Sequence, residues 1–415
     1  MKNSKALKIL LIIAAALVGA VAILLTTAAI ANAVSRSEME EYIDGYGKVA
    51  YENQLKPTVD ERGNYVFTTD GDFKVMQLTD IHIGGGFLYA DGDKKAIHAV
   101  AAMIKEEKPD LVIVTGDISF AVPMSGSLDN SRAHGYFKRL MENLGVYWTV
   151  TFGNHDAEKY NYYDREDVAE MYLDGNLRYC LFTESPDDVF GESNHVITVK
   201  NSLGLVTGAY VMIDSNAYTD KDIFGLGWDY DNVHDDQIEW YRETVEYYTA
   251  KNLATYNSLD ESLRPRDFDL SAVRSYMYMH IPPAEMLEEY NKAAEGDITD
   301  CDRYGIAGET GQVVYSSAYP DILFETVVEL GSTKAIFFGH DHLNSLRFTR
   351  DGVYMAYGMS IDYSAYAGAT GYQRGCTILT LRADGGVEII NSGYYSGLYD
   401  CLDDGVDMTL PEMYR

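Results

Sequence analysis

Five short polar motifs, each following an apolar run that is typical of a β-strand, constrain this chain more than any other feature. In order they are Asp80-Ile81-His82, Gly116-Asp117, Gly153-Asn154-His155-Asp156, His280 within Tyr278-Met279-His280-Ile281-Pro282, and Gly339-His340-Asp341-His342. Each motif alone arises by chance in many proteins, but all five in this order do not. Because open α/β sheets bind ligands at the carboxyl ends of their strands, the pattern predicts one large α/β domain that gathers the motifs at that edge.

The residue types in the motifs are those of a two-metal centre. Two metal ions about 3.5–4 Å apart need one ligand that reaches both, which a carboxylate can do and a neutral imidazole cannot. Asp117, directly after the apolar run 111–114, is the natural bridge. Mixed oxygen and nitrogen ligands argue against calcium, and no cysteine lies in the motifs, so a thiolate zinc site is not indicated. We expect two divalent metal ions, with Mn, Fe and Zn favoured over Co and Ni.

The motif set resembles the calcineurin-like metallophosphoesterase superfamily over residues 73–395. Within it, Gly-His-Asp-His, a following Gly/Tyr-rich run and Arg374-Gly375 before a strand are similar to the purple-acid-phosphatase-like branch. The resemblance implies a four-layer α/β/β/α sandwich of two mixed sheets with outer helices. It also implies a ligand set: Asp80, His82 and His342 for one metal ion, Asn154, His280 and His340 for the other, and Asp117 for both.

His155 is the motif histidine that the resemblance leaves without a metal. It implies that His155 faces the substrate, where an imidazole can protonate a leaving alkoxide or stabilise its charge. Asp156 either orients the His155 ring or ties down the loop. Arg374 is a candidate substrate-binding residue, because a guanidinium can clamp phosphate oxygens, with an ordinary ion pair as the equal alternative.

Phe120 departs from the branch. Purple acid phosphatases place a tyrosine ligand three residues after the aspartate of the second motif, and here that position is Phe120. A phenyl ring cannot bind a metal, so the coloured tyrosinate–iron(III) centre is not expected.

The N-terminus predicts contact with a membrane. Lys2, Lys5 and Lys8 precede an uncharged apolar run from Ile9 to Ile30, long enough to cross a bilayer of about 30 Å. The lysines place the N-terminus inside and the remaining chain in an extracytoplasmic location. Ala31-Asn32-Ala33 resembles a signal-peptidase site, but the length of the apolar run favours an uncleaved anchor over secretion.

We therefore expect a signal peptide or anchor over 1–33, a linker and approach arm over 34–72, the phosphoesterase domain over 73–395 and a tail over 396–415. Polar segments 252–272 and 284–318 are expected as insertions over the active-site side. Four cysteines, Cys180, Cys301, Cys376 and Cys401, allow three full pairings, and the sequence does not choose among them.

The predicted function is an exported phosphoesterase that hydrolyses phosphate monoesters with a hydroxide activated by two metal ions. The formal net charge of −31 disfavours nucleic-acid binding and leaves a small phosphate ester as the expected partner. One alternative is a phosphodiesterase acting on nucleotides or lipid head groups. Another is a non-catalytic, membrane-tethered binding protein, although no motif position is lost. The oligomeric state stays open.

Overall fold

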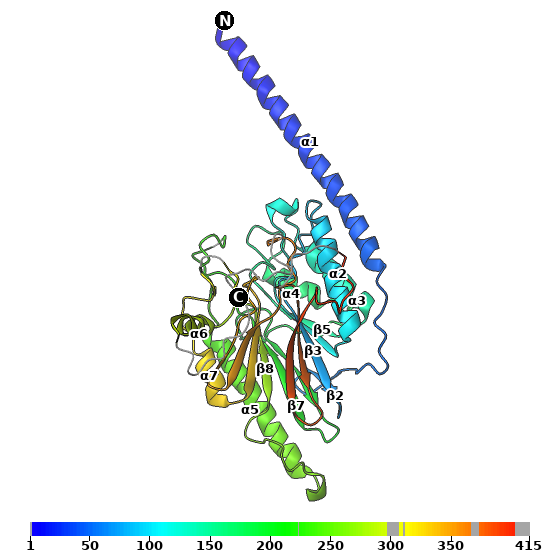
Figure 1. The fold of residues 1–415 in the computed structure, drawn as a ribbon. Helices are drawn as coiled ribbons and strands as arrows, with labels where there is room; N and C mark the ends of the chain where they lie inside the picture. Colours follow the sequence, from blue (N-terminus) through cyan, green and yellow to red (C-terminus); the bar gives the residue numbers. More distant parts are fainter. Residues whose placement is uncertain (1, 223, 297–306, 310–311, 367–372, 403–415) are drawn as a thin grey trace.

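The fold was analysed in a computed structural model that describes residues 2–222, 224–296, 307–309, 312–366 and 373–402. Its first element is the long helix α1 (Lys2–Asp44). The apolar part of α1 projects away from the rest of the molecule (Figure 1), and its stretch from Leu7 onward is long and apolar enough to cross a membrane. The last turns are different, because Met39 and Ile43 are buried in the core beneath α2 and α3.

Two sheets form the centre of the molecule. The five-stranded sheet has the order β13-β12-β3-β4-β5, with β3 (Phe73–Leu78), β4 (Leu111–Thr115), β5 (Trp148–Thr151), β12 (Gly375–Leu381) and β13 (Val387–Gly393). The eight-stranded sheet has the order β1-β2-β6-β7-β8-β9-β11-β10, with β1 (Thr58–Val59), β2 (Tyr65–Thr68), β6 (His195–Lys200), β7 (Val206–Met212), β8 (Ser275–Tyr278), β9 (Thr333–Phe338), β10 (Arg347–Arg350) and β11 (Val353–Tyr357). Both sheets mix parallel and antiparallel pairs.

Helices cover the outer face of each sheet. The five-stranded sheet packs against α2 (Ala90–Glu107), α3 (Ser131–Leu144) and α4 (Arg165–Tyr172). The eight-stranded sheet packs against α5 (Asp235–Ser258), α6 (Ala284–Glu295) and α7 (Leu323–Leu330). A third apolar cluster, which includes Phe73, Tyr210 and Phe337, fills the space between the sheets. The predicted four-layer α/β/β/α sandwich is confirmed.

Strand direction explains how the motifs meet. The parallel strands β3, β4 and β5 end just before the first three motifs, and the parallel pair β8 and β9 ends just before the last two. These strands are almost entirely buried, and apolar residues dominate most of them, as in Leu-Val-Ile-Val-Thr of β4. The amide of Gln77 donates to the carbonyl oxygen of Phe338 and joins the two sheets near this edge.

Several expected boundaries differ from the structure. The segment 34–72, expected as a linker, contains the end of α1 and the strands β1 and β2, and β2 pairs with β6 inside the sheet. The segment 284–318, expected to be irregular, contains α6. Within the predicted tail, residues 403–415 lie outside the described part of the chain.

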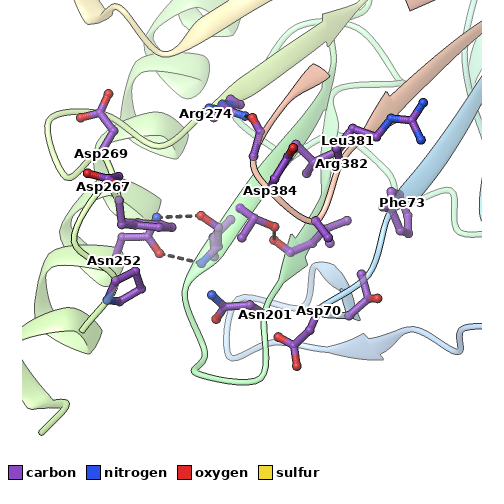
Figure 2. A pocket seen from close by; sticks show the side chains of 18 of the residues that line it. Asp70, Phe73, Asn201, Asn252, Asp267, Asp269, Arg274, Leu381, Arg382 and Asp384 are labelled. Atoms are coloured by element: carbon purple, nitrogen blue, oxygen red, sulfur yellow. Dashed lines mark hydrogen bonds between the residues drawn. The ribbon is translucent and has the colours of Figure 1, made fainter. Parts of the chain in front are cut away.

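The segment 252–272 also lies elsewhere than expected. Its residues 265–269 line a cavity of about 520 Å³ together with Phe73, Arg274 and Leu381 (Figure 2). Phe73 is the first residue of β3, and Leu381 is the last residue of the antiparallel β12, so this cavity lies at the sheet edge opposite the motifs. The prediction that 252–272 covers the active-site side is wrong.

Candidate metal centre

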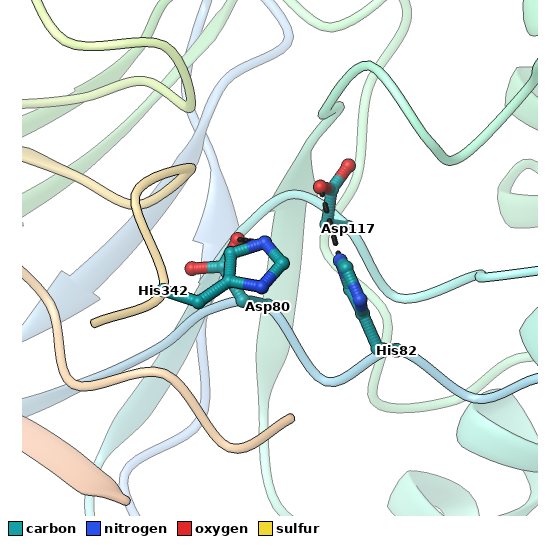
Figure 3. A group of neighbouring side chains, drawn as sticks. All are labelled: Asp80, His82, Asp117 and His342. Carbon is teal, nitrogen blue, oxygen red and sulfur yellow. Dashed lines mark hydrogen bonds and ion pairs between the residues drawn. The ribbon is translucent and has the colours of Figure 1, made fainter. Parts of the chain in front are cut away.

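The structure brings four of the predicted ligands into one buried cluster. Ligand atoms of Asp80, His82, Asp117 and His342 all lie within 4.8 Å of one another (Figure 3). Nε2 of His82 lies 3.2 Å from Oδ2 of Asp117, and Nε2 of His342 lies 3.5 Å from Oδ1 of Asp80. This is the residue set that the family resemblance implies for one metal ion and the bridge.

A second group adjoins the first through Asp117. Nε2 of His280 lies 3.2 Å from Oδ1 of Asn154 and 3.2 Å from Oδ2 of Asp117. The ring of His340 lies beside His280, with 5.1 Å between centroids. The same Asp117 oxygen therefore contacts one histidine of each group, as a shared ligand must.

Hydrogen bonds on the far side of the histidines fix which nitrogen faces the centre. Nδ1 of His280 lies 2.7 Å from the carbonyl oxygen of Thr115, which only accepts, so Nδ1 carries the proton and Nε2 faces inward. Asp362 lies behind two rings: its Oδ2 is within hydrogen-bond distance of Nδ1 of His342, at 3.1 Å, whereas its Oδ1 is 3.6 Å from Nδ1 of His82, too far for a hydrogen bond. The motifs did not include Asp362, although an aspartate shortly after the strand β11 is the same signal that marked Asp80 and Asp117.

The charges in this cluster suit cations. Burial lowers the pKa of the His342 imidazole, but Asp362 and Asp80 raise it more, to about 10. Burial likewise lowers the pKa of His280, while Asp117 and Asp80 raise it to about 9. Without metal, protonated imidazoles therefore neutralise the buried carboxylates. Divalent ions bound to deprotonated imidazoles would supply this positive charge instead, so the donor set fits a dinuclear centre.

The backbone at these residues is held in an unfavourable conformation. Asp80, His82, Asp117 and His340 have φ between 49° and 77°, and they are four of the eight non-glycine residues with positive φ in the described chain. Such conformations persist where surrounding contacts enforce them, and they concentrate at functional sites. Gly153 leaves room for the bridge, because a Cβ there would overlap the carboxylate of Asp117.

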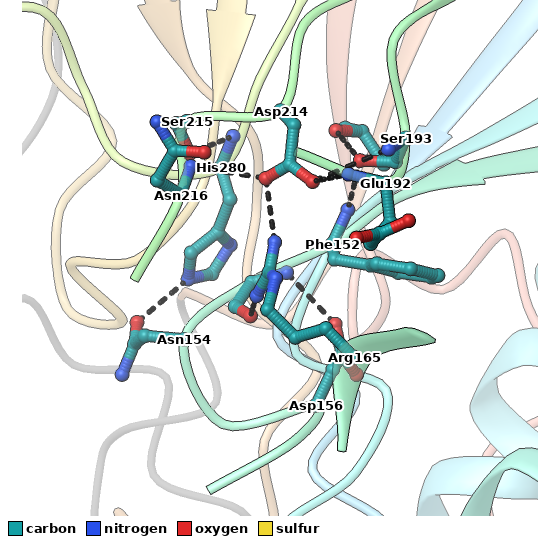
Figure 4. Close-up of polar contacts among 12 residues, drawn as sticks. Phe152, Asn154, Asp156, Arg165, Glu192, Ser193, Asp214, Ser215, Asn216 and His280 are labelled. Carbon is teal, nitrogen blue, oxygen red and sulfur yellow. Dashed lines mark hydrogen bonds and ion pairs between the residues drawn. The ribbon is translucent and has the colours of Figure 1, made fainter. Parts of the chain in front are cut away.

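Buried polar contacts hold the motif loops. The carboxylate of Asp156 accepts from the backbone N–H groups of Asp117, Ile118, Ser119 and Gly153 at 2.8–3.1 Å. Of the two roles considered for Asp156, the structure shows loop anchoring. Arg165 donates to the carbonyl oxygen of Gly153 and to the carboxylate of Asp214. Ser215 Oγ accepts from the backbone N–H of His280, and Figure 4 shows Arg165, Asp214, Ser215 and His280 side by side. These contacts fix the distance between the motif loops of the two sheets.

His155 lies at the open side of the centre. Its Nδ1 is 2.7 Å from Oε1 of Glu158, and its ring packs edge-on against His82 with 5.4 Å between centroids. Burial lowers the pKa of His155, but Asp117 and Glu158 raise it above 6.5, which favours a protonated ring. Glu158, three residues after His155, is thus the orienting carboxylate that sequence analysis missed.

A cleft of about 470 Å³ opens beside His155, His340 and His342. The other side chains that line it are mostly aromatic: Tyr89, Phe120, Trp228, Tyr230, Tyr315 and Tyr366, with Met124 and Glu309. Two of these come from the segment 284–318, so that part of the chain does reach the active-site side. The cleft gives a substrate access to both histidine groups.

Arg374 does not extend into this cleft. Its Nε and Nη2 donate to the carbonyl oxygen of Asp362 at 3.0 and 2.9 Å, and its guanidinium lies over the ring of Tyr363. Arg374 is buried and holds the backbone of Asp362, which hydrogen-bonds to His342. This arrangement matches neither the phosphate clamp nor the ordinary ion pair considered from the sequence.

Comparison with known proteins gives the family. The sequence profile of the calcineurin-like phosphoesterases matches residues 73–344. This chain belongs to the calcineurin-like phosphoesterase family. The match includes all five motifs of the candidate centre, and the predicted membership in the metallophosphoesterase superfamily is confirmed.

Relatives of this calcineurin-like phosphoesterase include plant and yeast proteins. The probable inactive purple acid phosphatase 14 of Arabidopsis thaliana is 26% identical over 334 residues, which cover 74% of this chain and 75% of the relative. Phosphatase DCR2 of Saccharomyces cerevisiae is 24% identical over 314 residues, 70% of this chain and 48% of that protein. A solved dimetal phosphatase from Danio rerio aligns with 78% of this chain and 96% of its own at 11% identity and a TM-score of 0.49.

Phe120 determines an expected optical property of this calcineurin-like phosphoesterase. Its ring stacks on His82 with 4.6 Å between centroids, so a tyrosine here would bring a phenol to the centre. We expect the metal-loaded protein to be colourless in the visible and insensitive to mild reductants, because no phenolate is present at this position. Absorption spectra of the wild type and Phe120→Tyr, both loaded with iron, provide the check. A strong visible band in the iron-loaded wild type would contradict this prediction.

Proposed function

We propose that this protein is a metal-dependent phosphomonoesterase whose centre is formed by the five motifs. The observation that carries the proposal is the contact of one Asp117 oxygen with histidines of both groups, beside an open cleft. Asp80, His82 and His342 would hold one divalent ion with Asp117, and Asn154, His280 and His340 the other. When bound, such a pair supplies hydroxide near neutral pH and neutralises charge on the phosphoryl oxygens.

The protein groups around the centre would do the remaining work. His155, oriented by Glu158, would donate a proton to the leaving alkoxide from the cleft side. Asp362 and the Thr115 carbonyl oxygen would keep the imidazoles in the tautomer that presents Nε2 to the metals. Arg374 and Asp156 would act indirectly, because they fix the loops that carry the metal ligands and His155.

The phosphodiesterase alternative differs only in substrate, and the cleft has space for two substituents on phosphorus. The non-catalytic alternative draws on the names of plant relatives that are described as probable inactive enzymes. Against it, all eight motif positions retain residues that can bind metal or transfer a proton. Those names describe the relatives and are not evidence that this chain lacks a metal ligand.

One panel of substrates tests the proposed function. Purified protein loaded in turn with Mn²⁺, Fe²⁺ or Zn²⁺ should hydrolyse p-nitrophenyl phosphate faster than bis-p-nitrophenyl phosphate. A faster reaction with the diester would favour the phosphodiesterase. No hydrolysis of either ester with any metal would overturn both enzymatic proposals and favour the binding protein.

We further propose that α1 stays attached as an anchor and that the phosphoesterase domain is extracytoplasmic. Asn32, inside the sequence that resembles a signal-peptidase site, is buried against the domain. Its amide donates to the carbonyl oxygen of Gly126 and accepts from the N–H of Phe87, and Arg132 donates to its carbonyl oxygen. Cleavage after Ala33 would remove all three contacts.

Two measurements test the anchor and the orientation separately. We expect protease added to intact spheroplasts to digest the domain, since lysines before the apolar run hold the N-terminus inside. We also expect mass spectrometry to find residues 1–33 on the mature protein. A mature chain that begins at Val34 would refute the anchor and leave export intact, whereas full protection from protease would refute export.

A further inference from the structure

The exit point of α1 lies beside the mouth of the active-site cleft. Asn32 is two residues after Ile30, the end of the apolar run, which is about 3 Å of helix rise. Its partners Phe87 and Gly126 belong to the loops that follow β3 and β4. Leu88 on the first loop donates its N–H to the Ser125 carbonyl oxygen on the second, so both loops meet at this point.

The side chains around this point are apolar and exposed. Leu88 is 60% exposed, and Met124, which lines the cleft, is 63% exposed. Trp228, which also lines the cleft and packs on Tyr315 of the cleft wall, is 63% exposed, and Leu226, two residues before it, is 84% exposed. We name Leu88, Met124, Leu226 and Trp228 the apolar rim. Exposed leucine and tryptophan beside an opening are costly in water and are typical of surfaces that enter the edge of a bilayer.

The position of α1 indicates that a membrane is what the apolar rim contacts. If Ile9–Ile30 spans the membrane, the docked Asn32 holds the two loops that carry Leu88 and Met124 close to the bilayer surface. Figure 1 shows the apolar part of α1 projecting past this end of the sandwich, away from the end at which α5 terminates. A cleft held in this position is more accessible to molecules in the membrane than to dissolved molecules.

We propose that the substrate is a phosphate monoester of a membrane lipid, taken directly from the outer leaflet through the apolar rim. The proposal rests on the proposed phosphomonoesterase function and on the retained anchor. The lipid phosphate would enter the cleft toward the two histidine groups, while its acyl chains stay in the bilayer against the rim. Hydrolysis adds water across the ester bond and leaves a lipid alcohol in the membrane and inorganic phosphate in solution.

A matched pair of substrates and a matched pair of variants test this proposal. Full-length protein is reconstituted in phosphatidylcholine vesicles and assayed on dioleoyl phosphatidate in the bilayer and on dissolved dibutyryl phosphatidate, which carries the same phosphate. The double variant Leu88→Ser/Leu226→Ser should lose about tenfold or more on the bilayer substrate, because burial of each leucine in the interface is lost, and less than about twofold on the dissolved one. The control is Leu253→Ser/Leu263→Ser, whose leucines are 46% and 52% exposed. Leu253 lies near the end of α5 and Leu263 lies after it, so this variant should change neither rate.

Fluorescence gives a readout that does not depend on turnover. The chain has three tryptophans, of which Trp148 is fully buried, so lipids brominated along the acyl chain should quench mainly Trp228. We expect quenching in the wild type that Trp228→Phe removes and Trp240→Phe keeps. Equal loss on both phosphatidates in the rim variant, wild-type rates on the bilayer substrate, or an unquenched Trp228 would each overturn the proposal. Absence of hydrolysis on every ester would refute the phosphomonoesterase function itself, while quenching would still report membrane contact.

Discussion

Asp117→Asn is expected to lower phosphoester turnover by at least about 10³-fold and to release bound metal. The Asp117 carboxylate contacts the imidazoles of His82 and His280, one from each histidine group. An amide is neutral, and one of its two polar atoms is an N–H₂ donor, so it cannot join two cations as an anionic bridge. Turnover and metal content measured on the same preparation give both effects.

A matched control separates this loss from a general effect of removing a buried carboxylate. Asp110 is half-buried, and its Oδ2 accepts from the backbone N–H of Lys74 at the opposite edge of the sheet. Asp110→Asn should keep both metal ions and near-normal turnover. An Asp117→Asn protein with two metals and wild-type turnover would withdraw Asp117 from the bridge.

His155→Ala should keep both metal ions and lose about 10²–10⁴-fold in turnover, the range for a lost general acid. The structure places His155 at the cleft, hydrogen-bonded to Glu158 and outside the buried ligand cluster. The loss should depend on the leaving group, because an alkoxide needs a proton and p-nitrophenolate is stable without one. We therefore expect a larger defect on alkyl phosphates than on p-nitrophenyl phosphate.

His98 offers a control of the same chemical type. Its imidazole bonds to Tyr46 and to the Asp400 carbonyl oxygen, away from the motifs, so His98→Ala should change neither metal content nor turnover. Equal defects of His155→Ala on both esters would favour electrostatic stabilisation of the phosphoryl group over proton donation. Loss of a metal ion would make His155 a ligand or a structural residue.

The residues of the candidate centre could be proposed from the sequence because they are marked locally. Asp80, Asp117 and His280 each follow a buried apolar strand within two residues, and parallel strands bring such positions to one edge. The roles of Glu158 and Asp362 were missed, because each role depends on the imidazole nitrogen that the carboxylate contacts. Only the three-dimensional structure shows these contacts. Arg374 was misplaced for the same reason, since only the fold shows that its donors are taken by the Asp362 backbone.

The missed elements have different causes. Helix α6 follows Pro282-Pro283 and is rich in Ala and Glu, so the sequence did mark where it begins. It was missed because the polar composition of the segment was taken as a sign of an insertion without regular structure. Strand β2 has only four residues and is held by its pairing with β6, which no local pattern reveals. Of the cysteines, Cys180 and Cys376 are buried free thiols, and Cys301 lies outside the described residues.

Metal analysis of the purified domain, coupled to removal and restoration of the ions, tests the central claim most directly. We predict two divalent ions per chain, loss of phosphomonoester hydrolysis when a chelator removes them, and recovery when Mn²⁺, Fe²⁺ or Zn²⁺ is returned. A folded protein that binds no divalent ion, or that hydrolyses phosphomonoesters equally well with and without it, would contradict the account.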